Sequence, residues 1–140
     1  MLGEEDLNPG GFHRWDCNVR VSSMMAPTLA IDDRRIIAVG SGGSNRLRTA
    51  ILQTLNNLYD FGMDARAAVA SPRIHVERDL LSIEPGFDDA VLEQVCAAFP
   101  QHHRWSERNL FFGGTHTVIH EGRAFSGAGD PRRGGVFRVV

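Results

Sequence analysis

The stretch with the clearest chemical potential is a glycine-rich loop inside VGSGGSNRLRTAILQTL, residues 39–55. An apolar run precedes it and apolar residues at helical spacing follow it, which predicts a strand, a loop and a helix in succession. Unpaired backbone N–H groups at such a junction, with the positive end of the helix dipole, favour an anion or a developing oxyanion. The phosphate motif G-x-x-x-x-G-K-[ST] is absent, and G-x-G-x-x-G fails because position 45 is Asn45. The alternative is that the glycines only permit a tight turn.

A pair of hydroxyls forms the second candidate, Ser22 and Ser23 in RVSSMMAPT. They would bind a ligand or, as adjacent serines commonly do, satisfy the backbone of a turn. Neither lies in G-x-S-x-G, so no nucleophile elbow is predicted.

Histidines offer a metal motif that the sequence argues against. His116 and His120 in HTVIH have the i, i+4 spacing of a zinc-binding helix. The residues between them are β-branched and favour a strand, where positions four apart lie about 13 Å from each other. We therefore expect no metal site here, and we expect His102 and His103 to lie in a solvated loop after Pro100.

Composition limits the partners and chemistry. The 140-residue chain is long enough for one domain with a core, and its formal charge of −2 gives no basic footprint for nucleic acid or for an anionic membrane surface. The basic side chains are all arginines and the sequence contains no lysine, which excludes lysine Schiff-base chemistry. The acidic amino terminus lacks an export signal and no apolar run is long enough to span a membrane, so a chain translated from Met1 is expected in the cytoplasm. Cys17 and Cys96 would pair or remain free, and we favour free thiols.

The pattern along the chain predicts strands and helices after an irregular lead-in over residues 1–21, which we expect to follow the surface of the domain. Ser44 or Asn45 would cap the first helix, Asp64 would cap the second, and Pro72 would end the second. The expected elements are a β-hairpin over 28–39, helices over 46–59, 65–70 and 88–99, strands over 73–77, 80–84, 110–120 and 123–128, and a loop at GDPRRGG. This order suits a layered α/β or α+β domain.

Several separated motifs, in order, resemble one known family. GEEDLNP, RVSSMMAPT, VGSGGSNRLRTAILQTL, AVASPRIH, GGTHTVI and FSGAGDPR are similar to the carboxy-terminal part of the small subunit of γ-glutamyltranspeptidases, which are N-terminal nucleophile hydrolases. The resemblance covers nearly the whole chain. It implies a single domain over 1–140 with an α+β fold: a partial αββα sandwich, lacking the strand that carries the amino-terminal nucleophile.

The resemblance also assigns roles to residues. In this family an amino-terminal threonine attacks the γ-glutamyl carbonyl, its own α-amine acts as the base, and water or an acceptor takes the glutamyl group. The glycine loop would hold the oxyanion: keeping the loop length selects Gly43 and Ser44, whereas matching the glycine pair selects Gly42 and Gly43. Both choices remain open. The substrate α-carboxylate would be bound by Ser22 and Ser23, and its α-amino group by Asp6.

Departures from the family pattern limit what this chain is expected to do alone. The nucleophilic threonine and the large-subunit region are missing from the sequence, and the Thr115-His116 dipeptide is internal. We therefore expect an inactive piece of a γ-glutamyltranspeptidase-like enzyme that supplies oxyanion and glutamyl-binding groups for glutathione-type γ-glutamyl compounds. The expected partners are a γ-glutamyl compound or glutamate and either a threonine-bearing segment with the large subunit or further copies of the chain; no cofactor is expected. The alternative is a non-enzymatic domain that binds a small amino acid or only assembles with a partner.

Overall fold

The computed structural model describes residues 7–11 and 14–140, and all structural statements below concern those residues. Two β-sheets and three α-helices form the body. The elements are β1 (Thr28–Ile31), β2 (Arg35–Gly40), α1 (Arg46–Tyr59), α2 (Ala65–Ala70), β3 (Ile74–Glu77), β4 (Leu80–Ile83), α3 (Asp89–Ala98), β5 (His102–Arg104), β6 (His116–Glu121) and β7 (Ala124–Ala128), with 3₁₀ turns η1 (Leu110–Phe112) and η2 (Pro131–Arg133). This confirms the α+β prediction and the expected order of the main elements.

The larger sheet is antiparallel throughout, with the order β1-β2-β6-β7. The Asp32 carboxylate closes the predicted hairpin between β1 and β2, because it accepts from the backbone N–H groups of Arg34 (2.8 Å) and Arg35 (2.9 Å). In the centre of the sheet Ile37 lies opposite Ile119, and both side chains are buried. The strands therefore alternate between a buried face and an open face.

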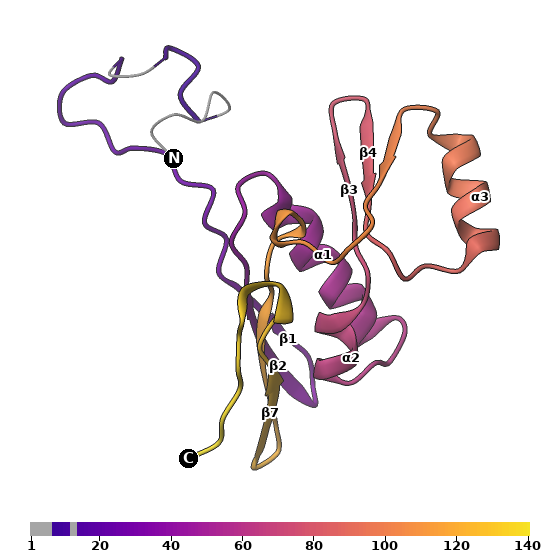
Figure 1. Cartoon of the computed structure of the whole chain (residues 1–140). Coiled ribbons are helices and arrows are strands. Elements are labelled where there is room, and N and C mark those ends of the chain that lie inside the picture. The colour runs from indigo at the N-terminus through magenta and orange to yellow at the C-terminus, as the bar shows by residue number, and fades with distance from the viewer. Residues whose placement is uncertain (1–6, 12–13) are drawn as a thin grey trace.

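Two helices cover the buried face of this sheet (Figure 1). The helical spacing predicted for α1 places Leu47, Ile51 and Leu58 in the core. Asp64 caps α2 as predicted, since its carboxylate accepts from the Ala67 N–H at 2.8 Å. Asn45 precedes α1, but its side chain makes no capping hydrogen bond.

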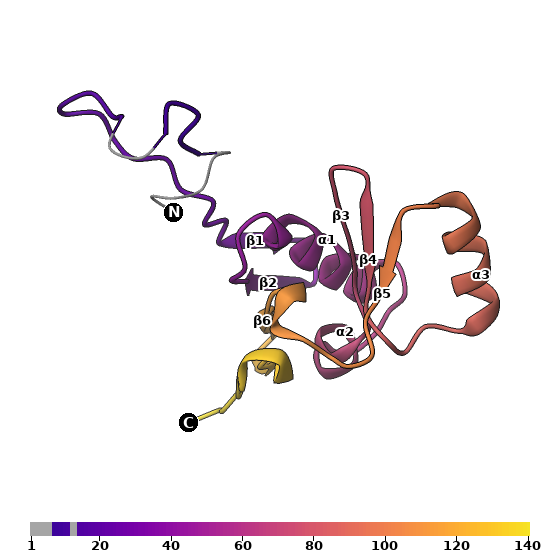
Figure 2. The same cartoon turned by 45° about the horizontal axis from the view of Figure 1, so that its top comes forward.

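The second sheet, β3-β4-β5, lies beyond the helices and carries α3 on its far side (Figure 2). Strands β3 and β4 are antiparallel, whereas β5 joins β4 in parallel after the α3 crossover. A small apolar cluster of Leu81, Ile83 and Leu92 joins this sheet to α3. From the open face of the first sheet outward, the layers are therefore sheet, helix, sheet and helix.

Two segments differ from the predictions. Residues 110–115 are not part of a strand: Asn109 caps a 3₁₀ turn by accepting from the Phe111 N–H, Gly113 has φ of 79°, and β6 starts only at His116. His102 and His103 are solvent-exposed, as expected, but they form strand β5 rather than a loop. Backbone pairing with β4 orders this polar segment without burying its side chains.

The lead-in contains neither a helix nor a strand in its described residues 7–11 and 14–27. Much of it stands away from the two-sheet body instead of following its surface (Figure 1). Cys17 and Cys96 are both free, as favoured. Among the described residues, no helix combines the length and the apolar character needed to cross a bilayer.

Candidate active site

The predicted anion site lies where β2 ends at Gly40 and α1 begins at Arg46. Within the described part of the chain, the backbone N–H groups of Gly42, Gly43 and Ser44 donate to no protein acceptor. Gly43 has φ of 133° and Ser44 has φ of 55°, so the loop turns sharply just before the helix. Three half-buried amides at an uncapped helix entrance have the donors and the dipole that an anion requires.

A second glycine turn supports this loop from behind. Gly43 and Gly113 pack backbone to backbone, because a Cβ atom on Gly43 would lie 3.2 Å from Gly113 Cα. A Cβ atom on Gly113 would lie 2.9 Å from Ser41 Oγ, and that oxygen accepts from the Gly114 N–H at 3.2 Å. The two turns therefore fit together only because both positions are glycine.

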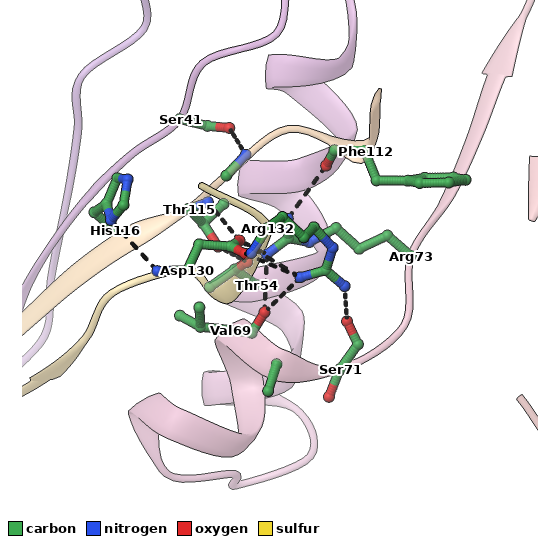
Figure 3. A network of polar contacts seen from close by, with 12 residues as sticks. Ser41, Thr54, Val69, Ser71, Arg73, Phe112, Thr115, His116, Asp130 and Arg132 are labelled. Carbon is green, nitrogen blue, oxygen red and sulfur yellow. Dashed lines mark hydrogen bonds and ion pairs between the residues drawn. The ribbon is translucent and has the colours of Figure 1, made fainter. Parts of the chain in front are cut away.

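The second turn is held by a buried network of four charged side chains, Arg73, Glu84, Asp130 and Arg132. Figure 3 labels Arg73, Asp130 and Arg132 of this network with their neighbours. Arg73 Nη2 donates to Asp130 Oδ2 at 2.7 Å, and Arg132 pairs with both Glu84 and Asp130. The four side chains are at most 8% exposed. Two positive and two negative groups balance, which is the condition under which charges are tolerated inside a protein.

Asp130 connects this network directly to the turn behind the glycine loop. Its carboxylate accepts from the backbone N–H groups of Thr115 and Arg132, both at 2.8 Å. Arg73 donates to Thr115 Oγ1 at 2.6 Å and to the carbonyl of Phe112 at 3.2 Å, and Thr115 Oγ1 also lies 3.0 Å from Thr54 Oγ1 on α1. The network thus fixes residues 112–115, against which the glycine loop rests.

The electrostatics favour the charged forms of Asp130 and Arg132. Burial alone would raise the pKa of Asp130, but the charge of Arg73 and the Arg132 N–H outweigh it, so the pKa of Asp130 lies below its usual value. Burial and the nearby charge of Arg132 lower the pKa of Arg73. Burial also opposes the charge of Arg132, but hydrogen bonding to Glu84 outweighs it and raises the pKa of Arg132. Asp130 is therefore ionised at neutral pH.

The serine segment approaches the same loop through Met24. Ser44 Oγ donates to Met24 Sδ at 3.5 Å, and a cavity of about 340 Å³ is lined by Leu7, Met24, Ser44, Asn45, Leu47 and Arg48. Ser22 and Ser23, just before Met24, are exposed, and Ser23 Oγ accepts from the Met25 N–H at 3.2 Å. Asp6 lies outside the described residues, although its neighbour Leu7 lines the cavity.

The two histidines of the HTVIH motif lie on a strand, as the β-branched residues between them predict. His116 and His120 lie on strand β6, and His116 Nδ1 accepts from the Asp130 N–H at 3.4 Å. His120 stacks on Phe125 of β7, with ring centroids 4.6 Å apart.

The charged network was not predicted from the sequence. AVASPRIH and FSGAGDPR contributed only to the family resemblance, and Glu84 was assigned simply to the end of a strand. Arg73 and Asp130 are 57 residues apart, and Arg132 and Glu84 are 48 apart. No local spacing links them, because each ion pair joins segments that are distant in the sequence.

Solved structures with the same arrangement define the fold class. The transpeptidase CapD of Bacillus anthracis is 23% identical, with a TM-score of 0.76 over 95% of this chain and 76% of that chain. γ-Glutamyltranspeptidase of Pseudomonas nitroreducens, solved with L-DON, is 28% identical, with a TM-score of 0.75 over 90% of this chain and 67% of that chain. The fold is therefore that of the N-terminal nucleophile hydrolases, as the resemblance implied.

The family follows from the sequence comparison. The Gamma-glutamyltranspeptidase family model matches residues 3–140, and the chain belongs to the γ-glutamyltranspeptidase family. The glutathione hydrolase proenzyme of Bacillus subtilis is 30% identical over 138 residues, covering 96% of this chain and 23% of the relative. That of Pseudomonas aeruginosa is 32% identical over 129 residues, covering 86% and 22%. The chain thus spans less than a quarter of the length of these relatives.

Proposed function

We propose that this chain supplies the oxyanion and glutamyl-binding groups for transfer or hydrolysis of γ-glutamyl compounds of the glutathione type. The observation that carries the proposal is the row of unengaged N–H groups at Gly42, Gly43 and Ser44, held at a helix entrance by a buried charged network. The substrate class in this proposal comes from the names of the relatives, which are glutathione hydrolase proenzymes. Preorganised amides of this kind stabilise a tetrahedral oxyanion by about 3 kcal/mol per donor.

The remaining roles follow the chemistry of an amino-acid end. Hydroxyls of Ser22 and Ser23 would bind the α-carboxylate, and Asp6 would bind the α-amino group. The contact between Met24 and Ser44 supports a serine pair close to the loop. Gly42 with Gly43, or Gly43 with Ser44, would then receive the oxyanion of the γ-carbonyl.

The nucleophile is proposed to come from another polypeptide segment. Thr115 is a poor candidate, because it is fully buried, its Oγ1 accepts from Arg73, and its N–H is a peptide amide that donates to Asp130. Without a threonine bearing a free α-amine the chain is expected to be inactive alone.

The open face of the first sheet supports a partner segment. It exposes apolar side chains from all four strands: Leu29, Ile31, Ile36, Val118 and Phe125, of which Leu29 is 67% and Ile31 70% exposed. An apolar sheet face needs a covering layer, and in an αββα sandwich that layer is a second sheet. We propose that a segment of the longer proenzyme, or else a second copy of the chain, covers this face.

The same face favours the second candidate function, a non-enzymatic domain that assembles with a partner and binds a small amino acid or nothing. Calorimetric titration of the chain with L-glutamate separates the two candidates. Binding that is lost in Ser22→Ala and Asp6→Ala, but kept in Ser126→Ala on exposed β7, supports the glutamyl site. Absence of binding in the wild-type chain leaves assembly as the function.

Complementation tests the enzymatic role itself. The chain is mixed with the threonine-bearing segment and large subunit of a related enzyme, and hydrolysis of γ-glutamyl-p-nitroanilide is followed. We expect activity only in the mixture, and sedimentation should show a complex. A stable complex without activity would contradict the enzymatic proposal, whereas a stable monomer that never associates would contradict the partner proposal.

A further inference from the structure

Arg133 lies directly against the glycine loop, although it comes from the opposite end of the chain. A Cβ atom on Gly42 would lie 3.6 Å from Arg133 Cζ and 3.7 Å from Nη1, and one on Gly43 would lie 3.5 Å from Nη2. The stem of the side chain rests on Gly114, where a Cβ atom would lie 2.7 Å from Arg133 Cγ. The guanidinium is thus placed beside the amides of the candidate oxyanion site.

The position of Arg133 is fixed, but its charge is not neutralised. The turn η2 holds its backbone, because Asp130 O accepts from the Arg133 N–H at 3.1 Å and from the Gly135 N–H at 2.9 Å. Its neighbour Arg132 points inward and pairs with Glu84 and Asp130. Arg133 is exposed and, within residues 7–11 and 14–140, its guanidinium makes no hydrogen bond or ion pair. The two carboxylates in this region are thus already engaged by Arg73 and Arg132, and Arg133 is available to a ligand.

We infer that Arg133 binds a carboxylate carried by the leaving group of the substrate, next to the scissile amide. This inference rests on the proposed function and deepens it. In a γ-glutamyl amino acid, the carboxyl carbon of the leaving amino acid is three bonds from the scissile carbonyl carbon, at most about 4 Å away. That separation matches a guanidinium in contact with the loop that holds the carbonyl oxygen. The planar guanidinium also matches a carboxylate in shape and hydrogen-bonding geometry.

The favoured substrates are therefore γ-glutamyl amino acids with a free carboxylate next to the scissile amide. This narrows the proposed substrate class, because in glutathione the carboxyl at that position forms a peptide bond. Compounds whose leaving group is neutral at that position would lose this contact. Because Arg133 is exposed, its contribution is that of a solvent-screened pair, and we expect a discrimination of about five- to tenfold.

The test compares two ligands that differ only in this charge, γ-L-glutamylglycine and γ-L-glutamylglycinamide, by calorimetric titration of the full 140-residue chain. The wild-type chain should bind the acid about five to ten times more tightly than the amide. Arg133→Ala should bring this ratio close to one by weakening the acid alone, and Arg133→Lys should restore part of it, because the charge remains without the planar fork. Arg123→Ala, at the exposed turn between β6 and β7, removes the same charge far from the loop and should keep the wild-type ratio. Circular dichroism of each variant checks the fold.

Each outcome gives a decision. An acid-to-amide ratio that is unchanged in Arg133→Ala overturns the inference and leaves the proposed function standing, provided that Ser22→Ala still abolishes binding. Equal weakening of both ligands also overturns it, because the guanidinium would then act on the carbonyl oxygen that both share. If neither dipeptide nor glutamate binds the wild-type chain, the proposed function fails and the inference fails with it.

Discussion

Replacing Asp130 by asparagine removes one of the two negative charges in the buried network while keeping the size of the side chain. Asp130 is fully buried and accepts from Arg73 Nη2 at 2.7 Å and from the N–H groups of Thr115 and Arg132, both at 2.8 Å. An asparagine has one acceptor oxygen, and its NH₂ group would face a guanidinium or a backbone N–H group. One buried arginine is then left without a balancing charge, which costs about 3–5 kcal/mol. Asp130→Asn should lower the free energy of unfolding by that amount.

Urea denaturation followed by far-UV circular dichroism measures this loss. Asp33→Asn in the exposed β1–β2 turn is the matched control and should change the free energy of unfolding by less than about 0.5 kcal/mol. Combining Asp130→Asn with Arg73→Met should cost less than the sum of the single changes, because the uncompensated charge is removed. A loss below about 1 kcal/mol in Asp130→Asn would refute the claim that this network holds the turn behind the loop.

The acid side of the stability profile gives an independent check on Asp130. Its pKa in the folded protein lies below the usual 3.8, so its contribution to stability is present above that value and is lost as the pH falls through the lowered pKa. The wild-type chain should therefore lose more stability than Asp130→Asn on acidification below about pH 4. Parallel profiles for the two proteins would contradict the assignment.

Three further changes test other contacts. Gly43→Ala should lower the free energy of unfolding by about 1–3 kcal/mol and abolish glutamate binding. The reason is that Gly43 has φ of 133° and that a Cβ atom there would lie only 3.2 Å from Gly113 Cα. Unaltered urea and glutamate titrations would contradict this. Thr54→Val should cost about 1 kcal/mol in urea denaturation by removing the partner of Thr115 Oγ1 at 3.0 Å. The control is Thr28→Val, because Thr28 is only half-buried and its hydroxyl donates to the carbonyl of Ala26 in an exposed hydrogen bond; equal costs would argue against the buried hydrogen bond. Burial lowers the pKa of His75 below its usual 6.5, so the contribution of neutral His75 to stability is lost as the pH falls below that value. The free energy of unfolding of His75→Gln should therefore decrease less between pH 7 and pH 5 than that of the wild-type chain. Equal decreases would exclude His75 as the group responsible.

Local patterns predicted the parts of the fold that depend on local physics. The helix at Arg46–Tyr59 follows from apolar spacing, and the short helix at Ala65–Ala70 follows from Asp64 at its start and Pro72 after its end. The hairpin of β1 and β2 follows from two apolar runs around a polar turn. Each of these signals lies within one element and its ends.

The parts that sequence reasoning missed depend on distant partners. Leu110–Phe112 has the composition of a strand, but Asn109 and the left-handed Gly113 favour a 3₁₀ turn beside α1. His102–Arg104 becomes a strand only because β4 offers a free edge. The glycine loop itself was recognised, whereas its support by Arg73 and Asp130 was not, because that contact exists only after the fold has brought the middle of the chain and its carboxy-terminal part together.

The central claim is that a pair of loop amides, Gly42 with Gly43 or Gly43 with Ser44, receives the oxyanion of a γ-glutamyl group, and amide-resolved NMR tests it most directly. The probe is L-2-amino-4-phosphonobutyrate, in which a tetrahedral phosphonate replaces the γ-carboxylate of glutamate. Titrating it into ¹⁵N-labelled chain should move the amide proton resonance of Gly43 downfield together with that of Gly42 or Ser44, as expected when an N–H begins to donate to an anion. Unchanged resonances at all three positions, with shifts confined to other parts of the chain, would contradict the account.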